Sequence, residues 1–242
     1  MAEQQTWQWS SRIAVTEPES ENIFYGVLKR GMDIFLTFAL LILLSPLLLL
    51  IALLIKLDSP GPVIFTQERV GAKRQKLGRQ RVWLVQNFKF YKFRSMVQDA
   101  DPSLHEAYIK DFVEGRAQPT PESGGKFKLT NDPRVTRVGC FLRKFSLDEL
   151  PQLFNVLKGD MSLVGPRPVP TYEVAGYRPR HHHRFAAMPG ITGWWQVKGR
   201  CRVSFEEMIR LDLDYIRNAS LWFDLKILFL TIPAVLSRRG AE

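Results

Sequence analysis

The chain has 242 residues, of which 45% are hydrophobic and 24% charged, and its formal net charge is +10. That length holds one sizeable core, or one membrane element with one compact domain, and the charge favours anionic partners such as nucleic acid, lipid headgroups or phosphorylated substrates. Cys140 and Cys201 have no partner at metal-ligand spacing, which excludes a disulfide-rich secreted domain and indicates a reducing compartment.

Residues 1–22 are polar and lack apolar periodicity, so we predict a poorly ordered tail and assign it no function. A long apolar run then covers residues 34–55, and as a helix it would measure about 33 Å, enough to cross a bilayer. The preceding polar segment and the missing cleavage site argue against a signal peptide.

The apolar run has a proline at its centre and cations at both ends. The positive-inside rule therefore places both ends on the cytoplasmic side. Pro46 removes a helical hydrogen bond and clashes with the carbonyl of Ile42, so the helix must bend there. We predict that residues 23–57 form a re-entrant helix-break-helix hairpin in which Ser45 bonds a freed carbonyl. A kinked single crossing is the alternative.

Residues 58–242 are predicted to form a cytoplasmic, membrane-associated catalytic domain, mainly α with small β-hairpin elements. Residues 63–65 and 82–85 predict short strands around a basic loop, which is either solvated or faces anionic headgroups. The polar connection 99–133 is expected to carry one short helix, and the interrupted apolar segment 221–236 a helix lying in the membrane interface.

Two adjacent carboxylates, Asp148 and Glu149, precede a segment with helical apolar spacing. Ser146 and Glu149 have the spacing of a capping box, and Pro151 equally allows a helix start at Asp148. In either register a helix N-terminus keeps both carboxylates ionised and favours bound phosphate.

Capping alone would explain the two acids, but two arginines accompany them. Arg143 lies shortly before the pair, and Arg167 is held between two prolines. An ionised Asp can attack phosphorus when a divalent metal and arginines offset the repulsion between anions. This combination predicts nucleophilic catalysis on a phosphate.

Several motifs in this region resemble those of the bacterial sugar transferase family, the monotopic phosphoglycosyl transferases, and they occur in the family's order. The resemblance covers about residues 25–240. Its motifs are Lys92-Phe93-Arg94-Ser95-Met96, Ser146-Leu147-Asp148-Glu149-Leu150-Pro151-Gln152, Gly159-Asp160-Met161-Ser162-Leu163-Val164-Gly165-Pro166-Arg167-Pro168 and Pro189-Gly190-Ile191-Thr192-Gly193.

The resemblance implies that a sugar-1-phosphate passes from a UDP-sugar to a polyprenyl (undecaprenyl) phosphate, with release of UMP. Asp148 would attack the sugar-linked phosphorus, hold the phosphosugar covalently and contact Mg²⁺, with Glu149 as its partner carboxylate. We also expect Lys92, Arg94, Arg143 and Arg167 to bind substrate phosphate. Nucleotide binding is assigned to Thr192, Gln196 and Arg200. For Thr192 and Gln196, a role in the core or in a loop is an equal alternative.

The family's membrane motif matches Lys29, Arg30, Asp33, Ser45 and Pro46. The resemblance therefore also implies a bacterial inner-membrane enzyme with its catalytic domain on the cytoplasmic face, acting in the first membrane step of exopolysaccharide, capsule or O-antigen biosynthesis. Membrane lipids are expected partners. A monomer and a homodimer are both compatible with the sequence.

Three other functions compete with this prediction. One keeps the enzyme chemistry but changes the acceptor, for example to a non-polyprenyl lipid phosphate, and the sequence leaves it open. A nucleic-acid binder would need a groove-reading element, and the sequence has none, so we expect no nucleic-acid partner. A membrane-tethered basic binding protein or anchor without catalysis would use the carboxylates only as caps. The run of three histidines, 181–183, is not expected to bind a metal, because adjacent side chains point apart, and we predict a basic surface there instead.

Overall fold

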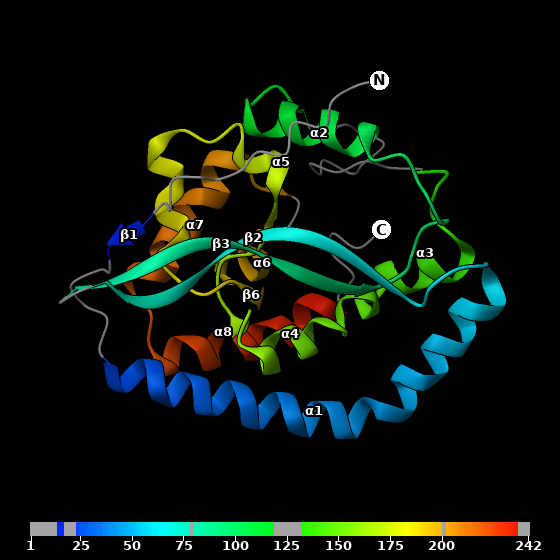
Figure 1. Cartoon of the computed structure of the whole chain (residues 1–242), viewed down its shortest axis with the longest axis horizontal. Coiled ribbons are helices and arrows are strands. Elements are labelled where there is room, and N and C mark those ends of the chain that lie inside the picture. The colour runs from blue at the N-terminus through cyan, green and yellow to red at the C-terminus, as the bar shows by residue number, and fades with distance from the viewer. Residues whose placement is uncertain (1–13, 17–22, 78–79, 119–131, 200–201, 237–242) are drawn as a thin grey trace.

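The computed structural model describes residues 14–16, 23–77, 80–118, 132–199 and 202–236. A long antiparallel hairpin, formed by β2 (Ile64–Leu77) and β3 (Gln80–Phe93), crosses the molecule. In Figure 1 the hairpin lies between two groups of helices: α2 (Ser103–Val113), α5 (Thr171–Val174) and α7 (Phe205–Arg217) on one side, and α1 (Ile23–Asp58), α4 (Gln152–Lys158) and α8 (Leu221–Leu236) on the other.

The prediction of two short strands around a basic loop was wrong in extent. The strands run through the basic segment, and residues 64–77 pair continuously with residues 80–93. Alternating positions of a strand face opposite sides, so the hairpin can bury one row of side chains while the other carries charge. Runs of Lys and Arg hid this alternation in the sequence.

The sheet and the remaining elements complete one domain. The strand order is β1-β3-β2-β5, with β1 at Ala14–Thr16 and β5 at Val169–Pro170, so part of the amino-terminal tail pairs with β3. A separate parallel pair joins β4 and β6. The other elements are α3 (Arg137–Lys144), η1 (Leu147–Glu149), β4 (Ser162–Val164), η2 (Pro179–Phe185), β6 (Gly190–Thr192) and α6 (Trp194–Lys198).

Helix α1 is one bent helix with Pro46 inside it, rather than two helices separated by a break. Ser45 Oγ donates a hydrogen bond of 2.8 Å to the Ile42 carbonyl, the group that Pro46 leaves without its helical donor. The helix over Phe24–Asp58 is long and apolar enough to cross a membrane, and 11% of its most apolar 18-residue stretch is buried in the protein. Such low burial distinguishes α1 from the core helix of a soluble protein.

The first turns of α1 are tied to the domain by the predicted membrane motif. Lys29 pairs with the fully buried Asp224 of α8 at 2.8 Å. Arg30 donates to two carbonyls at the end of α4, and Asp33 accepts from the backbone N–H of Leu163 in β4. These polar residues therefore dock α1 onto α4, β4 and α8.

The last turn of α1 is tied down separately. Asp58 Oδ2 accepts from the backbone N–H of Val138, at the start of α3. The buried Arg94 guanidinium donates to the carbonyls of Ser59 and Pro60, at 2.6 and 2.7 Å. The prediction that Arg94 binds substrate phosphate is therefore not supported, because its guanidinium holds the turn that follows α1.

Apolar side chains cover much of the outer surface of α1 and α8. They include Phe35, Leu43, Leu49 and Leu57 on α1, each more than 70% exposed. On α8, Trp222 is 78% exposed and Phe229 is 70% exposed. The short helix expected within 99–133 is present as α2, and the helix predicted at 221–236 is present as α8. The exposed patches on α1 and α8 are of the kind that mark membrane or protein contact.

The predicted basic surface around the three histidines is only partly present. His181 and Arg184 are each 1% exposed, and Arg184 pairs with the buried Asp212 at 2.7 Å. His181 packs edge-on against Phe205 of α7. This segment therefore joins η2 to α7 through a buried ion pair, with only part of its charge outside.

The outer edge of β3 depends on Asn155 of α4. Beyond Leu84 this edge pairs with no described strand, and Asn155, which is fully buried, bonds it instead. Its amide donates to the Lys89 carbonyl at 2.6 Å and accepts from the Tyr91 N–H at 3.1 Å. The two bonds fix α4, and with it the preceding turn, against the end of β3.

We expect Asn155→Ala to lower the free energy of unfolding by about 2 to 4 kcal/mol, because it leaves two backbone groups without partners. Thermal unfolding of the detergent-solubilised protein should show a Tm lower by about 4 °C or more. Asn218→Ala, which removes an exposed bond at the end of α7, is the control and should change the Tm by less than half as much. Equal shifts would contradict the role given to Asn155.

Candidate active site

The two carboxylates lie on the short turn η1, between α3 and α4. The prediction that they lie in the first turn of a helix beginning at Ser146 or Asp148 is wrong, because α4 begins only at Gln152, after Pro151. Ser146 has a left-handed backbone with φ of 57° and makes no side-chain cap, so the predicted capping box is absent. The acids therefore do not serve as helix caps.

Glu149 is held by two cations from different elements. Its Oε1 accepts from Lys92 Nζ at 3.0 Å, and Arg167 forms a two-pronged pair with both of its oxygens, that to Oε2 being 3.1 Å long. Burial by itself would raise the pKa of Glu149, but the charges of Arg167 and Lys92 outweigh it and hold the pKa well below its ordinary value. Glu149 is therefore ionised at neutral pH.

Asp148 is 6% exposed and lies beside the same lysine, with Lys92 Nζ 3.3 Å from its Oδ2. Among the described residues its other oxygen, Oδ1, accepts no hydrogen bond. Lys92 thus touches both carboxylates and offsets their mutual repulsion. One oxygen of Asp148 is left for a substrate or a metal.

Arg143 stands in the last turn of α3, beside η1, and within the described part of the chain its side chain makes no hydrogen bond or ion pair. Its charge reaches the site, since it helps to lower the pKa of both Asp132 and His105. Helix α3 packs close to the segment that follows β3, because Gly139 lies against the backbone of Ser95. A Cβ at position 139 would overlap the Ser95 carbonyl oxygen. A cation kept unpaired near two acids suits an anionic ligand.

Four further residues surround the site, and sequence analysis did not identify them as site residues. In the hairpin register Gln67 and Arg69 fall on the same face as Lys92. Arg69 donates to the Pro168 carbonyl at 2.9 Å, beside Arg167. Strand alternation would have placed it there, had the basic segment been recognised as a strand.

The other two are Tyr172 of α5 and His105 of α2, whose ring nitrogen lies 2.6 Å from the Tyr172 hydroxyl. Burial, assisted by the charges of Arg69 and Arg134, lowers the pKa of His105 to about 4, so its ring is neutral. Burial raises the pKa of Tyr172 to about 12. The 99–133 connection thus places α2 close enough to the site to feel its charges, a tertiary contact with no local sequence signal.

The predicted nucleotide residues are not brought to the carboxylates by any hydrogen bond between described residues. Thr192 is buried, with its hydroxyl 2.8 Å from that of Thr231 in α8, and Gln196 donates to the Ile191 carbonyl. The core and loop roles left open for these two residues account for these contacts. Arg200 lies outside the described residues.

A magnesium ion would find few protein ligands here. Within the described ranges no three His, Cys, Asp or Glu side chains gather to hold a metal. Magnesium commonly uses one or two carboxylates and completes its shell with water and substrate phosphates. Asp148 Oδ1 fits such a site, whereas both Glu149 oxygens are engaged by Lys92 and Arg167.

The lowered pKa of Glu149 makes its contribution to stability pH-dependent. A carboxylate with a lowered folded pKa stabilises fully above its unfolded value of 4.5, and this stabilisation is lost as the pH falls toward the folded pKa. We therefore expect the Tm difference between wild type and Glu149→Gln to be constant above about pH 5.5 and to shrink below about pH 4.5. Glu207→Gln, at an exposed pair with Arg210, should show little difference at any pH.

Known proteins are similar to this chain over most of its length. The family model described as "Bacterial sugar transferase" matches residues 24–238. Undecaprenyl-phosphate galactose phosphotransferase of Salmonella typhimurium is 45% identical over 214 residues, covering 88% of this chain and 41% of that protein. UDP-glucose:undecaprenyl-phosphate glucose-1-phosphate transferase of Escherichia coli is 42% identical, covering 85% of this chain and 39% of that protein.

Exopolysaccharide production protein ExoY of Rhizobium meliloti is 41% identical over 216 residues, which are 89% of this chain and 88% of that protein. The chain thus spans about two-fifths of the two phosphotransferases and most of ExoY. The match to the family model includes α1, the hairpin and the turn with both carboxylates. The chain belongs to the bacterial sugar transferase family.

Proposed function

We propose that this protein transfers a sugar-1-phosphate from a UDP-sugar to undecaprenyl phosphate, giving the lipid diphosphate sugar and UMP. One observation carries the proposal most directly: a buried aspartate with an oxygen left open lies among cations that are fixed by a second carboxylate. The names of the relatives specify undecaprenyl phosphate as acceptor and galactose or glucose as the sugar. The sugar that this enzyme transfers is identified by measuring UMP release from different UDP-sugars.

In the first step, Asp148 attacks the phosphorus that bears the sugar. A P–O bond forms to the carboxylate, the bond from the same phosphorus to the oxygen that bridges the two donor phosphates breaks, and UMP leaves with that oxygen and the electron pair. Arg143 and Lys92 lie where they can offset the charge of the donor diphosphate. The product is a phosphosugar bound to Asp148 as a mixed anhydride.

In the second step, an oxygen of the lipid phosphate attacks the same phosphorus and releases Asp148. A phosphate monoester is mostly dianionic at neutral pH and needs little help in losing a proton. Glu149, with its lowered pKa and both oxygens engaged, is better suited to fix Lys92 and Arg167 than to accept a proton. We therefore propose a positioning role for Glu149.

Magnesium completes the proposal as the expected cofactor. Bound through Asp148 and the donor phosphates, it would neutralise charge on the diphosphate and improve its leaving group. The Asp148 carboxylate would supply one oxygen for that contact and the other for the attack, and the neighbouring cations would orient the remaining phosphate oxygens.

We further propose that α1 is re-entrant and that the domain lies on the cytoplasmic face of the inner membrane. Both ends of α1 are tied to the same domain, the first turns through Lys29 and the last through Asp58. The bend at Pro46 and the exposed apolar side chains between those ends suit entry into one leaflet and return from it.

The catalytic proposal is tested by UMP release from a panel of UDP-sugars, with magnesium and undecaprenyl phosphate in detergent. Asp148→Asn should lower the rate by about 1,000-fold or more, since it removes the nucleophile, and Glu149→Gln by about 100-fold, since it releases the cations. Asp111→Asn, at an exposed pair with Arg116, is the matched control and should keep wild-type activity. A folded Asp148→Asn protein with more than a tenth of wild-type activity would exclude Asp148 as nucleophile.

The re-entrant arrangement is tested by cysteine labelling. Phe24 and Leu57 are 67% and 76% exposed at opposite ends of α1. Phe24→Cys and Leu57→Cys, each with Cys140 and Cys201 changed to Ser, should both react with an impermeant maleimide in inverted vesicles and not in spheroplasts. Labelling of one of them from the outside would show a single crossing instead.

A further inference from the structure

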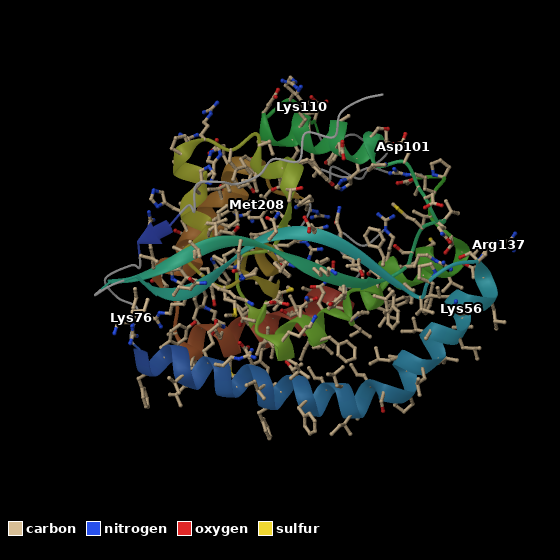
Figure 2. The ribbon with its side chains drawn as sticks, viewed as in Figure 1. Lys56, Lys76, Asp101, Lys110, Arg137 and Met208 are labelled. Carbon is tan, nitrogen blue, oxygen red and sulfur yellow. The ribbon has the colours of Figure 1, made fainter. Side chains whose placement is uncertain are left out.

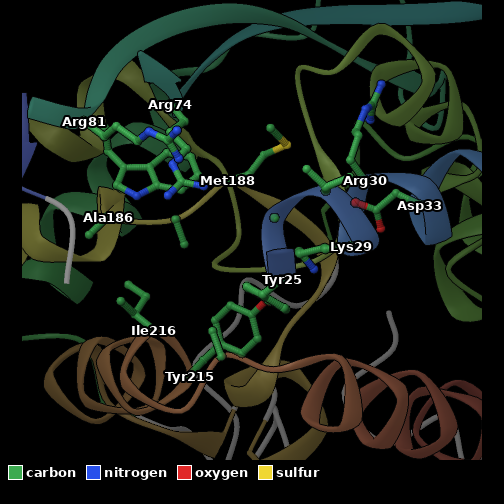
Figure 3. A pocket seen from close by; sticks show the side chains of 15 residues that line it. Tyr25, Lys29, Arg30, Asp33, Arg74, Arg81, Ala186, Met188, Tyr215 and Ile216 are labelled. Atoms are coloured by element: carbon green, nitrogen blue, oxygen red, sulfur yellow. The ribbon is translucent and has the colours of Figure 1, made fainter. Parts of the chain in front are cut away.

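A cavity lies far from the carboxylates, between the amino-terminal end of α1, the far end of the hairpin and the α7–α8 connection. Its volume is about 420 Å³. Figure 3 shows Arg74 and Arg81 of the hairpin at one end, with Lys29, Arg30 and Asp33 of α1 at the other. Apolar side chains fill most of the wall between them: Val27, Trp83, Ala186, Ala187, Met188 and Ile216.

The cavity is separate from the candidate active site. Arg81 and Lys92 belong to the same strand, eleven positions apart, which corresponds to about 35 Å along β3. Figure 2 shows the same separation with two labelled residues at opposite ends of the molecule. One is Lys76, near Arg81 along the chain, and the other is Arg137, at the start of α3. A phosphate bound at Arg81 could not also reach Asp148.

The charges in the cavity are not equivalent. At one end Lys29 and Arg30 are engaged by Asp224 and by backbone carbonyls, and Asp33 adds negative charge. At the other end Arg81 is exposed, and its side chain makes no hydrogen bond or ion pair with any described residue. Arg74 reaches so close to α1 that a Cβ on Gly26 would lie 3.0 Å from its Nη1. An anion is therefore favoured at the arginine end alone.

The cavity also opens toward the apolar surface of α1. Val27 lines the cavity and is 67% exposed, next to Phe24, which is 67% exposed as well. A ligand with an anionic head and an apolar tail could place its head at Arg81, its first chain atoms along Met188 and Ile216, and its remaining chain past Val27. A free anion would leave the apolar wall unused.

We propose that this cavity binds an anionic phospholipid of the surrounding membrane, as a site distinct from those for donor and acceptor. Arginine pairs well with phosphate oxygens, and mostly apolar cavities of this size hold amphiphilic ligands. The bound lipid would fasten the hairpin to the start of α1. The proposal rests on the membrane placement of α1 proposed above, but not on the chemistry at Asp148.

Native mass spectrometry of the detergent-solubilised full chain tests the site, with phosphatidylglycerol or phosphatidylcholine as probe. Wild type should bind one phosphatidylglycerol about tenfold more tightly than phosphatidylcholine, and Arg81→Gln should remove that preference. Ala219→Leu, which adds volume at the cavity wall, should weaken both lipids. Arg137→Gln, an exposed arginine on α3, is the matched control and should bind as wild type does.

Three results would overturn the proposal: no preference for phosphatidylglycerol in wild type, an unchanged preference in Arg81→Gln, or displacement of the lipid by equimolar inorganic phosphate. UMP release measured on the same samples separates this site from the catalytic proposal. Arg81→Gln should keep its activity in detergent, whereas failure of the catalytic proposal would leave the lipid binding unchanged.

Discussion

The pairing of Glu149 with Arg167 and Lys92 is the contact on which the candidate site depends. It joins η1 to the segment after β4 and to the end of β3, three pieces that are distant in sequence. Without Glu149, Lys92 and Arg167 would lack their shared partner, and Asp148 would face a less ordered set of cations. A partly buried ion pair is costly to break, because each partner left behind remains partly desolvated. The same pairing keeps Glu149 ionised and frees Asp148 for chemistry.

The membrane helix and the site are parts of one framework. Asp58 at the end of α1 bonds α3, the helix that carries Arg143, and Arg94, which directly follows the strand that carries Lys92, bonds the turn after α1. Residues just beyond the apolar segment thus set the position of two cations near Asp148. This connection explains how a site built on phosphate chemistry can be held at a fixed depth beside a lipid surface.

Local sequence patterns predicted the elements that depend on local physics. The apolar run, Pro46 and the bond from Ser45 gave the bent α1, and the interrupted apolar segment gave the helix at 221–236. The polar connection 99–133 indicated one short helix without fixing its bounds. The carboxylate pair and Arg167 were identified from residue type and from motifs, and the structure brings them together.

What could not be predicted depends on tertiary contact. The hairpin was underestimated because charged residues masked its alternation, so Arg69 was missed as a neighbour of Arg167. Arg94 looked like a phosphate ligand, since nothing local reveals that its guanidinium is buried against the turn after α1. The contact of His105 with Tyr172 joins α2 to α5 across 67 positions of sequence, and no local rule anticipates it.

In the proposed mechanism Asp148 carries the phosphosugar during transfer. The most direct measurement is to mix the enzyme with magnesium and a UDP-sugar labelled in the sugar, without lipid acceptor, to quench in acid and to map the labelled peptide by mass spectrometry. We expect one phosphosugar per chain on the peptide that contains Asp148, and we expect this label to be lost when undecaprenyl phosphate is added before the quench. An active enzyme that forms no adduct, or forms it on another residue, would exclude Asp148 as the residue that carries the phosphosugar.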